Sequence, residues 1–347
     1  MKLKHRLRNA ALLLPTGIYQ RVIRRDFIGL YYHVVSDAPL PHLKHLYAFK
    51  SPAAFEDDLR YLKAHFNCIT YAQLESYQTH GTKLPPKALL LTFDDGLSQC
   101  FSTVRPLLLR HQIPCVFFVT TDFLDNRGLA VDMKASLCIE KYFSAEDEFR
   151  QSFSQAYALE FGKDYPAPDA VKDWIKNLVG NNPVELDALC EWMGIDVQAY
   201  LAREKPYLSS EQVMQLHADG FAIGAHSLRH ERLSELTPQE LENNIVQSCQ
   251  VVQDLTGAAN IPFAFPFSAE GISRTLLQEI RANHPFVGLY FGGNGIVTDS
   301  ETIIPRFCGD SPNGSSPGRS NLEVRIANVY LEALSLKLFK LAAQQRR

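Results

Sequence analysis

The chain has 347 residues, of which 46% are hydrophobic and 21% are charged, and its formal net charge at pH 7 is -3. These values are typical of a soluble globular protein with a large buried core, arranged in one domain or two. They exclude a strong overall attraction to nucleic acid, and the sequence has no zinc-finger spacing, P-loop or dinucleotide-binding glycine fingerprint, so we expect no nucleic-acid partner. No feature of the sequence specifies an oligomeric state.

The first 25 residues carry seven Lys or Arg and no acidic residue. Their apolar side chains share one face of a predicted helix: Leu3, Leu7, Ala10, Ala11 and Leu14. We interpret residues 1–25 as a basic amphipathic arm, which either packs on the domain or makes a peripheral contact with anionic lipid. The apolar part ends at Pro15, which makes it too short for a signal peptide, and no clear cleavage site or bilayer-spanning run follows.

Seven cysteines are scattered at positions 68, 100, 115, 138, 190, 249 and 308. An odd number without close spacing argues against a disulfide framework and for a reducing compartment. We therefore expect a cytoplasmic protein, with the basic arm available for contact with the inner face of the membrane.

The main domain is predicted over residues 26–309 and begins with alternating strands and helices. Branched and aromatic residues over 27–35 predict a first strand, and a helix follows over 55–65. An apolar run over 89–93, a helix over 104–110 and a strand over 115–120 continue the pattern. This βαβαβ order predicts an α/β fold with a parallel sheet or barrel.

The composition changes between about 130 and 205, where Glu, Asp, Lys and Ala are frequent and aromatic residues are irregularly spaced. We predict a helical insertion there, with breaks near 166–168 and 181–183. The insertion either shapes a substrate cleft or carries a partner surface.

Alternation returns after the insertion. We predict helices over 210–219 and 238–256, the second opened by Thr237 and Pro238, and strands over 221–225, 261–267, 286–291 and 302–307. Residues 310–347 are predicted to form a linker, rich in Ser, Pro and Gly over 311–318, and an amphipathic C-terminal helix over about 321–342.

Two adjacent carboxylates, Asp94 and Asp95, end the apolar run and precede Gly96. In a parallel sheet such residues lie where reactive groups gather, at the ends of the strands. Because neighbouring side chains point to opposite sides of a strand, one acid is able to bind a metal while the other handles a proton. Taken alone, the pair also fits an ordinary turn or a helix cap.

A second metal-type signal is the pair His226 and His230, which follows another apolar run. On a helix or helical turn, two histidines four apart share a face and bind one ion together. With one carboxylate they make a ligand set that suits Zn²⁺ and is also accepted by Co²⁺, Ni²⁺ or Fe²⁺. By themselves they equally fit a solvated surface.

The two signals together resemble a known family. The run Thr92–Gly96 looks like the first signature of the polysaccharide deacetylases, carbohydrate esterase family 4, and His226–His230 is similar to the second. The resemblance covers about 27–307 and implies a distorted (β/α) barrel of about seven parallel strands, here with a helical insertion. It implies one divalent metal ion, Zn²⁺ before Co²⁺, Ni²⁺ or Fe²⁺, held by Asp95, His226 and His230. Asp94 would be the general base.

The sequence departs from the commonest family pattern at the general acid. Many members supply this acid from a late histidine motif, and no such motif is present here. Instead, residues 31–35 resemble the first strand of the circularly permuted poly-N-acetylglucosamine deacetylases, in which a Tyr-His near the start supplies the acid. This resemblance assigns His33 as the general acid. The alternative is a strand histidine whose ring is satisfied by the backbone.

The third motif is also altered. It appears as 263–267, with Ala264 in the place of the arginine that orients the base. Phe267 matches the position whose backbone N–H serves the oxyanion and binds substrate. Arg306 is a candidate to replace the missing arginine beside Asp94, and a structural ion pair is the alternative for it.

The resemblance predicts a hydrolase that removes N-acetyl groups from an N-acetylhexosamine-containing polysaccharide, oligosaccharide or lipid-linked sugar, releasing a free amine and acetate. Hydrolysis of a non-sugar amide or ureide on the same scaffold is the second reading. A catalytically silent saccharide-binding protein is the third, and the presence of both acids and both histidines argues against it.

Overall fold

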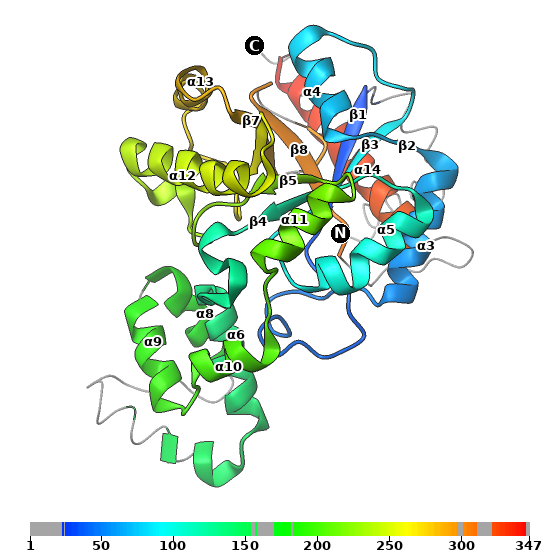
Figure 1. The fold of residues 1–347 in the computed structure, drawn as a ribbon. Coiled ribbons are helices and arrows are strands. Elements are labelled where there is room, and N and C mark those ends of the chain that lie inside the picture. The colour runs from blue at the N-terminus through cyan, green and yellow to red at the C-terminus, as the bar shows by residue number, and fades with distance from the viewer. Residues whose placement is uncertain are drawn as a thin grey trace. The chain divides into compact units, whose positions relative to one another are not determined.

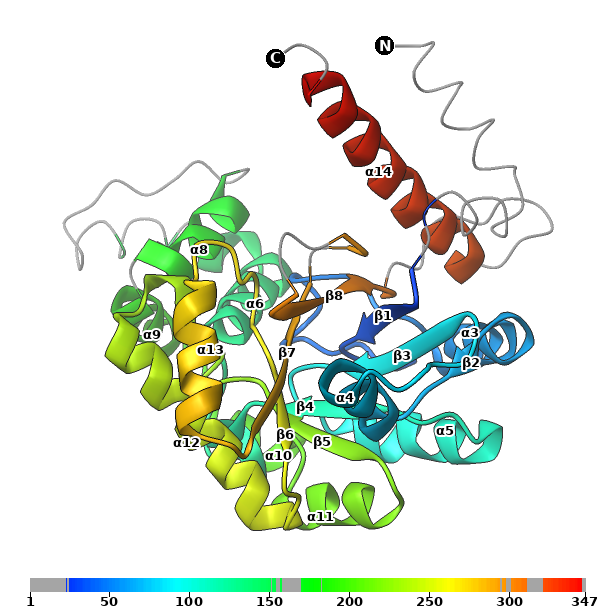
Figure 2. The ribbon, with the colours of Figure 1, turned by 90° about the horizontal axis from the view of Figure 1, so that it is seen from above.

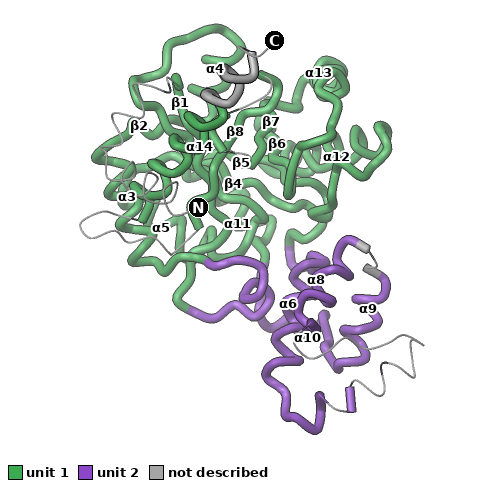
Figure 3. Tube along the Cα trace, turned by 180° about the vertical axis from the view of Figure 1, so that it is seen from behind, with its two compact units in different colours: residues 1–37, 49–124, 207–347 green, residues 38–48, 125–206 purple. Residues whose placement is uncertain are grey.

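The computed structural model describes residues 23, 25–150, 152–153, 157, 170–181, 183–293, 295–297, 301–310 and 321–344. These form two compact units (Figure 3). The first comprises residues 1–37, 49–124 and 207–347, and the second comprises 38–48 and 125–206. Nearly all of the predicted N-terminal arm and the linker segment 311–320 lie outside the described residues.

The first unit is built on a closed barrel of parallel strands (Figure 1). In the described part of the chain its ring runs β1-β8-β7-β6-β5-β4-β3 and closes through the pairing of β1 with β3. The short strand β2 pairs with the beginning of β3. The strands are β1 Phe27–Tyr32, β2 Asn67–Cys68, β3 Ala88–Phe93, β4 Val116–Val119, β5 Ala222–Ala225, β6 Ile261–Ala264, β7 Val287–Gly292 and β8 Ile303–Cys308. The predicted distorted barrel of about seven parallel strands is confirmed.

Alternation along the strands divides the barrel's apolar residues into two layers. Leu89 and Leu91 of β3 belong to the larger cluster, shared by strands and outer helices, whereas Leu90 belongs to a second cluster with Phe118 and Phe291 from other strands. Because a strand alternates its side chains between two faces, the second cluster fills the barrel interior. The interior is therefore a packed core, and chemistry is confined to the rim.

Helices surround the barrel, with α5, α11, α12 and α13 on the outside of the strands (Figure 2). Helix α4 differs, because its Tyr71 and Leu74 enter the interior cluster, where the Tyr71 hydroxyl accepts a hydrogen bond from the Leu289 N–H at 3.1 Å. The helices of this unit are α3 Pro52–His65, α4 Tyr71–His80, α5 Arg105–His111, α11 Ser210–Ala218, α12 Pro238–Thr256, α13 Arg274–Asn283 and α14 Asn321–Gln344.

The second unit is helical. Its helices are α6 Val131–Ser144, α8 Val171–Asn181, α9 Pro183–Trp192 and α10 Val197–Glu204. An aromatic and aliphatic cluster, including Tyr157, Ile175 and Leu189, forms its own core. The segment 38–48 joins this unit through the contact between His42 Nδ1 and the Tyr200 hydroxyl at 2.7 Å.

Most predicted elements are present, with shifted ends. The capped start of α12 at Thr237 and Pro238 is confirmed, including a capping box with Glu240. Two predicted strands are too long: β1 ends at Tyr32 instead of residue 35, and β6 ends at Ala264 instead of residue 267. Helices α4 and α13 were not predicted. Within the described residues, none of the helices has the length and apolarity needed to cross a bilayer.

Candidate active site

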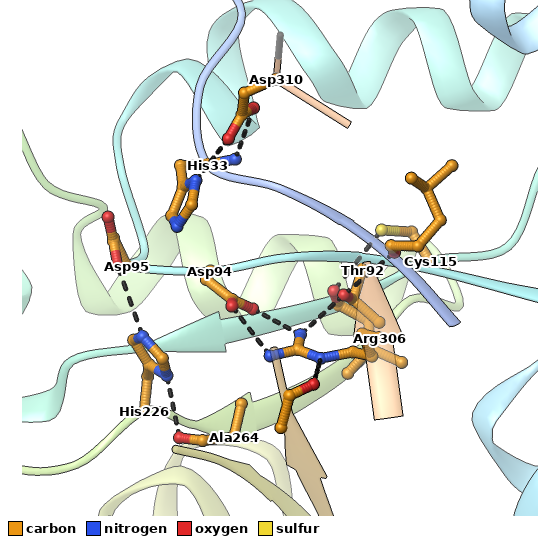
Figure 4. A network of polar contacts seen from close by, with 12 residues as sticks. His33, Thr92, Asp94, Asp95, Cys115, His226, Ala264, Arg306 and Asp310 are labelled. Carbon is orange, nitrogen blue, oxygen red and sulfur yellow. Dashed lines mark hydrogen bonds and ion pairs between the residues drawn. The ribbon is translucent and has the colours of Figure 1, made fainter. Parts of the chain in front are cut away.

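The predicted site residues gather at the carboxyl ends of the barrel strands. His33 follows β1, Asp94 and Asp95 follow β3, and His226 follows β5. Arg306 lies within β8. Parallel strands in a closed barrel bring their carboxyl ends to one rim, so residues up to 273 positions apart along the chain meet there. Figure 4 shows five of these side chains converging.

Asp95, His226 and His230 form a group whose ligand atoms all lie within 4.8 Å of one another. Asp95 Oδ1 is 3.4 Å from His226 Nε2 and 3.3 Å from His230 Nε2. His226 Nδ1–H donates to the Ala264 carbonyl at 2.9 Å, and since that oxygen only accepts, the proton must be on Nδ1. In the neutral ring the lone pair is then on Nε2, the nitrogen nearest Asp95, where a metal ligand needs it.

Electrostatics keep Asp95 ionised. Burial alone would raise the pKa of the Asp95 carboxyl, but the imidazoles of His33, His230 and His226 outweigh burial and hold this pKa well below its usual range. The carboxylate is thus anionic among nitrogen donors, which is the protonation state that a cation requires.

The chain reaches this geometry through backbone conformations that ordinary residues seldom adopt. Asp95, Ser227, His230 and Phe267 have φ values of 72°, 66°, 58° and 56°. Left-handed backbone at non-glycine residues is costly and concentrates at functional sites. His226 and His230 do not lie on a helix: they lie on an irregular loop, in which Ser227 and His230 have left-handed backbone.

Two residues that the sequence did not single out hold this loop. Asn244 of α12 is 4% exposed; its Oδ1 accepts from the Leu228 N–H at 3.1 Å and its Nδ2 donates to Glu231 Oε2 at 3.0 Å. Glu231 Oε2 also accepts from the Arg229 N–H at 3.0 Å. The helical periodicity of α12 places Asn244 on the buried face. A polar residue at such a position is the one sequence signal for this role, because a buried amide needs hydrogen-bond partners.

Asp94 is paired with Arg306, as the sequence suggested. Nη1 of Arg306 donates to Asp94 Oδ1 at 2.7 Å and Nη2 donates to Oδ2 at 2.9 Å. The guanidinium, in a residue that is 1% exposed, also donates to Thr92 Oγ1 at 2.8 Å. Its Cζ lies 4.9 Å from the centre of the Tyr31 ring. This two-point contact fixes the plane of the carboxylate and leaves each oxygen a further lone pair.

His33 lies on the other side of the acid pair (Figure 4) and is bound to a residue that the sequence missed. Its Nδ1–H donates to Asp310 Oδ2 at 2.5 Å, and its backbone N–H donates to Asp310 Oδ1 at 3.2 Å. Burial would lower the pKa of the imidazole, but Asp310, followed by Asp95, reverses this and raises the pKa of His33 to about 10. The ring is therefore a protonated acid at neutral pH. The alternative was a strand histidine whose ring is satisfied by the backbone, whereas the ring of His33 donates to the Asp310 side chain.

Phe267 lies three residues beyond β6 and is 43% exposed. Its ring centroid is 4.7 Å from that of His230, and Arg232 Cζ lies 4.6 Å from its centre. The exposed ring thus lies against both the His230 imidazole and the Arg232 guanidinium.

Comparison with known proteins agrees with this geometry. A family model for polysaccharide deacetylase matches residues 81–284, more than half of the chain. The chain belongs to the polysaccharide deacetylase family. It is accordingly a hydrolase of amide C–N bonds. The matched region contains both acids and both histidines of this deacetylase, whereas His33, Arg306 and Asp310 lie outside it.

Three solved structures share the deacetylase fold at low identity. The Streptococcus pyogenes deacetylase PplD, solved with acetate, has a TM-score of 0.53 and 14% identity, over 83% of this chain and 94% of PplD. IcaB from Ammonifex degensii has a TM-score of 0.50 and 16% identity, over 87% and 96%. A polysaccharide deacetylase from Bacillus cereus has a TM-score of 0.50 and 14% identity, over 88% and 68%. No curated protein sequence matches this deacetylase significantly.

Proposed function

We propose that the protein is a metal-dependent N-deacetylase of a saccharide that contains N-acetylhexosamine. One observation carries the proposal: two imidazoles and a carboxylate converge beside an arginine-bound aspartate and a histidine-aspartate pair. The donor set of Asp95, His226 and His230 fits a divalent ion of the zinc class, with Zn²⁺ before Co²⁺, Ni²⁺ or Fe²⁺. When bound, the ion would polarise the amide carbonyl and lower the pKa of a coordinated water molecule.

Asp94 is proposed as the general base. Its carboxylate is held in one plane by Arg306, and the remaining lone pairs accept the proton of the attacking water. Arg306 keeps the carboxylate oriented without competing as a base, because a guanidinium does not give up its proton in proteins. Arg306 is thus a positioning residue for Asp94.

His33 is proposed as the general acid. It faces the acid pair from the opposite side, and Asp310 holds its Nδ1–H (Figure 4). The proton on its other nitrogen goes to the leaving amine as the C–N bond breaks. The backbone N–H of Phe267 is proposed to donate to the oxyanion, because this residue occupies the family's donor position. The products are a free amine and acetate.

Substrate panels test this proposal. Metal-free protein would be reloaded with one equivalent of Zn²⁺ and given acetylated chito-oligosaccharides, small cyclic amides or ureides. We expect equal amounts of free amine and acetate from the saccharides, and none from Asp94→Asn that still binds metal. Cleavage of the small amides alone would favour the non-sugar reading, and no release from any substrate would contradict the proposed activity.

For localisation, we propose a cytoplasmic protein whose basic arm contacts anionic lipid at the inner membrane face. The sequence supports this through seven basic residues and no acidic residue among the first 25. At low salt we expect the protein to sediment with anionic liposomes and not with neutral ones. A variant with Gln at Lys2, Lys4, Arg6 and Arg8 should remain in solution, and equal sedimentation of both proteins would contradict the arm's role.

A further inference from the structure

A second group of metal-type donors lies behind the general acid. His33, Cys308 and Asp310 place one ligand atom each within 4.8 Å of one another, and they share no residue with the first group. His33 Nδ1 is 2.5 Å from Asp310 Oδ2, and Cys308 Sγ is 3.3 Å from the same oxygen. A nitrogen donor and a sulfur donor thus both lie against one carboxylate oxygen.

These separations are close to those of a tetrahedral zinc site. Zinc–ligand bonds of about 2.0–2.3 Å at tetrahedral angles set neighbouring donors roughly 3.3–3.7 Å apart. The sulfur–oxygen separation already has this value, and the nitrogen–oxygen separation needs to open by somewhat under 1 Å. The set differs from the first group because it contains a thiol, which favours thiophilic ions.

The group is both anchored and reachable. Cys308 ends β8, where it pairs in register with Tyr31, and the next N–H, of Gly309, donates to the Tyr31 carbonyl at 2.8 Å. The Asp310 side chain is 4% exposed, whereas the His33 side chain is 20% exposed and Cys308 is half-buried. An ion can therefore approach from the sulfur and imidazole side while the carboxylate stays fixed.

We propose that His33, Cys308 and Asp310 form a second, inhibitory site for a thiophilic divalent cation of the Zn²⁺ class. The inhibitory consequence rests on the proposed function, because it assumes that His33 is the acid. On binding, bonds form from the ion to Nδ1, Sγ and a carboxylate oxygen; the Nδ1 proton and the thiol proton are released to solvent. The hydrogen bond between His33 and Asp310 breaks, and the ring loses the imidazolium charge that lets it protonate an amine.

Cobalt titration of the full chain tests the site without reference to turnover. The first equivalent of Co²⁺ should give only weak d–d bands, because the first group has no sulfur. A second equivalent should add an intense near-ultraviolet thiolate-to-cobalt band. This band should be lost in Cys308→Ser and kept in Cys68→Ser, a matched control with a half-buried cysteine on β2. A band that persists in Cys308→Ser, or never forms, overturns the site.

Zinc titration tests the inhibitory role. Turnover should rise to one equivalent of Zn²⁺ and fall beyond it, and the half-inhibitory concentration should be at least about 10-fold higher in Cys308→Ser, relative to that variant's own maximum. Equal inhibition of both proteins overturns the role. If the proposed function itself fails, turnover is absent at every metal ratio while the thiolate band still reports the site.

A measurement on the unaltered protein tests the site even if the Cys308→Ser variant fails to fold. Alkylation of Cys308, followed by peptide mass spectrometry, should slow by about 10-fold or more between one and two equivalents of Zn²⁺. Alkylation of Cys68 in the same sample should not change. Unchanged alkylation of Cys308 overturns the proposal.

Discussion

Replacing Asp310 by Asn tests the link between the histidine-aspartate pair and acid catalysis. The change keeps the side-chain shape and removes the charge that receives two hydrogen bonds from His33. Asp310 is the largest influence that raises the pKa of His33 to about 10, against burial. Without it, we expect this pKa to return toward the ordinary histidine value of about 6.5.

The size of the effect follows from the protonated fraction of the ring. At pH 8 an imidazole with a pKa of about 10 is almost fully protonated, whereas one with a pKa of about 7 is protonated in roughly one molecule of ten. We therefore expect at least about a 10-fold loss of kcat/KM at pH 8. The alkaline limb of the pH–rate profile should move down by one or more pH units, while the acid limb stays in place. An unmoved alkaline limb would refute the assignment.

Folding stability gives an independent readout. Because the pKa of His33 is higher in the folded state, its stabilising contribution is complete below about pH 6.5 and is lost as pH rises through about 10. The free energy of unfolding of the metal-free protein should fall over this window by up to about 1.4 kcal/mol per pH unit. Asp310→Asn should remove that slope. Asp219→Asn, which breaks an ion pair with Arg105 on α5, is the control and should leave both the slope and the rate profile unchanged.

Three further predictions concern the other groups. Asp94→Asn should lower turnover by about 10²- to 10⁴-fold at unchanged metal content, measured by metal analysis beside acetate release; normal turnover would exclude Asp94 as the base. Arg306→Met should lower the free energy of unfolding by about 3–5 kcal/mol, measured by denaturant titration, because it leaves the buried Asp94 carboxylate without its partner; a loss of unfolding free energy below about 1 kcal/mol would show that water reaches the Asp94 carboxylate. His226→Ala should weaken metal binding by at least about 10- to 100-fold in equilibrium dialysis; unaltered affinity would place the ion elsewhere.

The alternation of apolar strands with helices predicted a parallel sheet or barrel, and the resemblance to the deacetylase family implied the barrel. The run ending at Phe93 is buried on both faces, which is typical of a parallel strand and independent of distant contacts. The same logic located Asp94, Asp95 and His226, since each directly follows such a run. Arg306 was named as a candidate for the motif arginine that the family resemblance requires, because it lies toward the end of another predicted strand.

What sequence reasoning missed depends on contacts between distant segments. Asp310 follows β8 and looks like an ordinary loop acid; only closure of β8 against β1 brings it to His33, 277 residues away. The spacing of four residues between His226 and His230 did not reveal the irregular loop that carries them, because spacing does not report φ. The left-handed residues that shape this loop are stabilised by Asn244 from α12, which the local sequence does not reveal.

The central claim is that one cation held by Asp95, His226 and His230 is required for amide hydrolysis. Its most direct test follows acetate release while metal-free protein is titrated with Zn²⁺. We predict no release without metal, a linear rise up to one equivalent, and no rise in His230→Ala over the same range. Full activity in the metal-free protein, or the same rise in the variant, would contradict the claim.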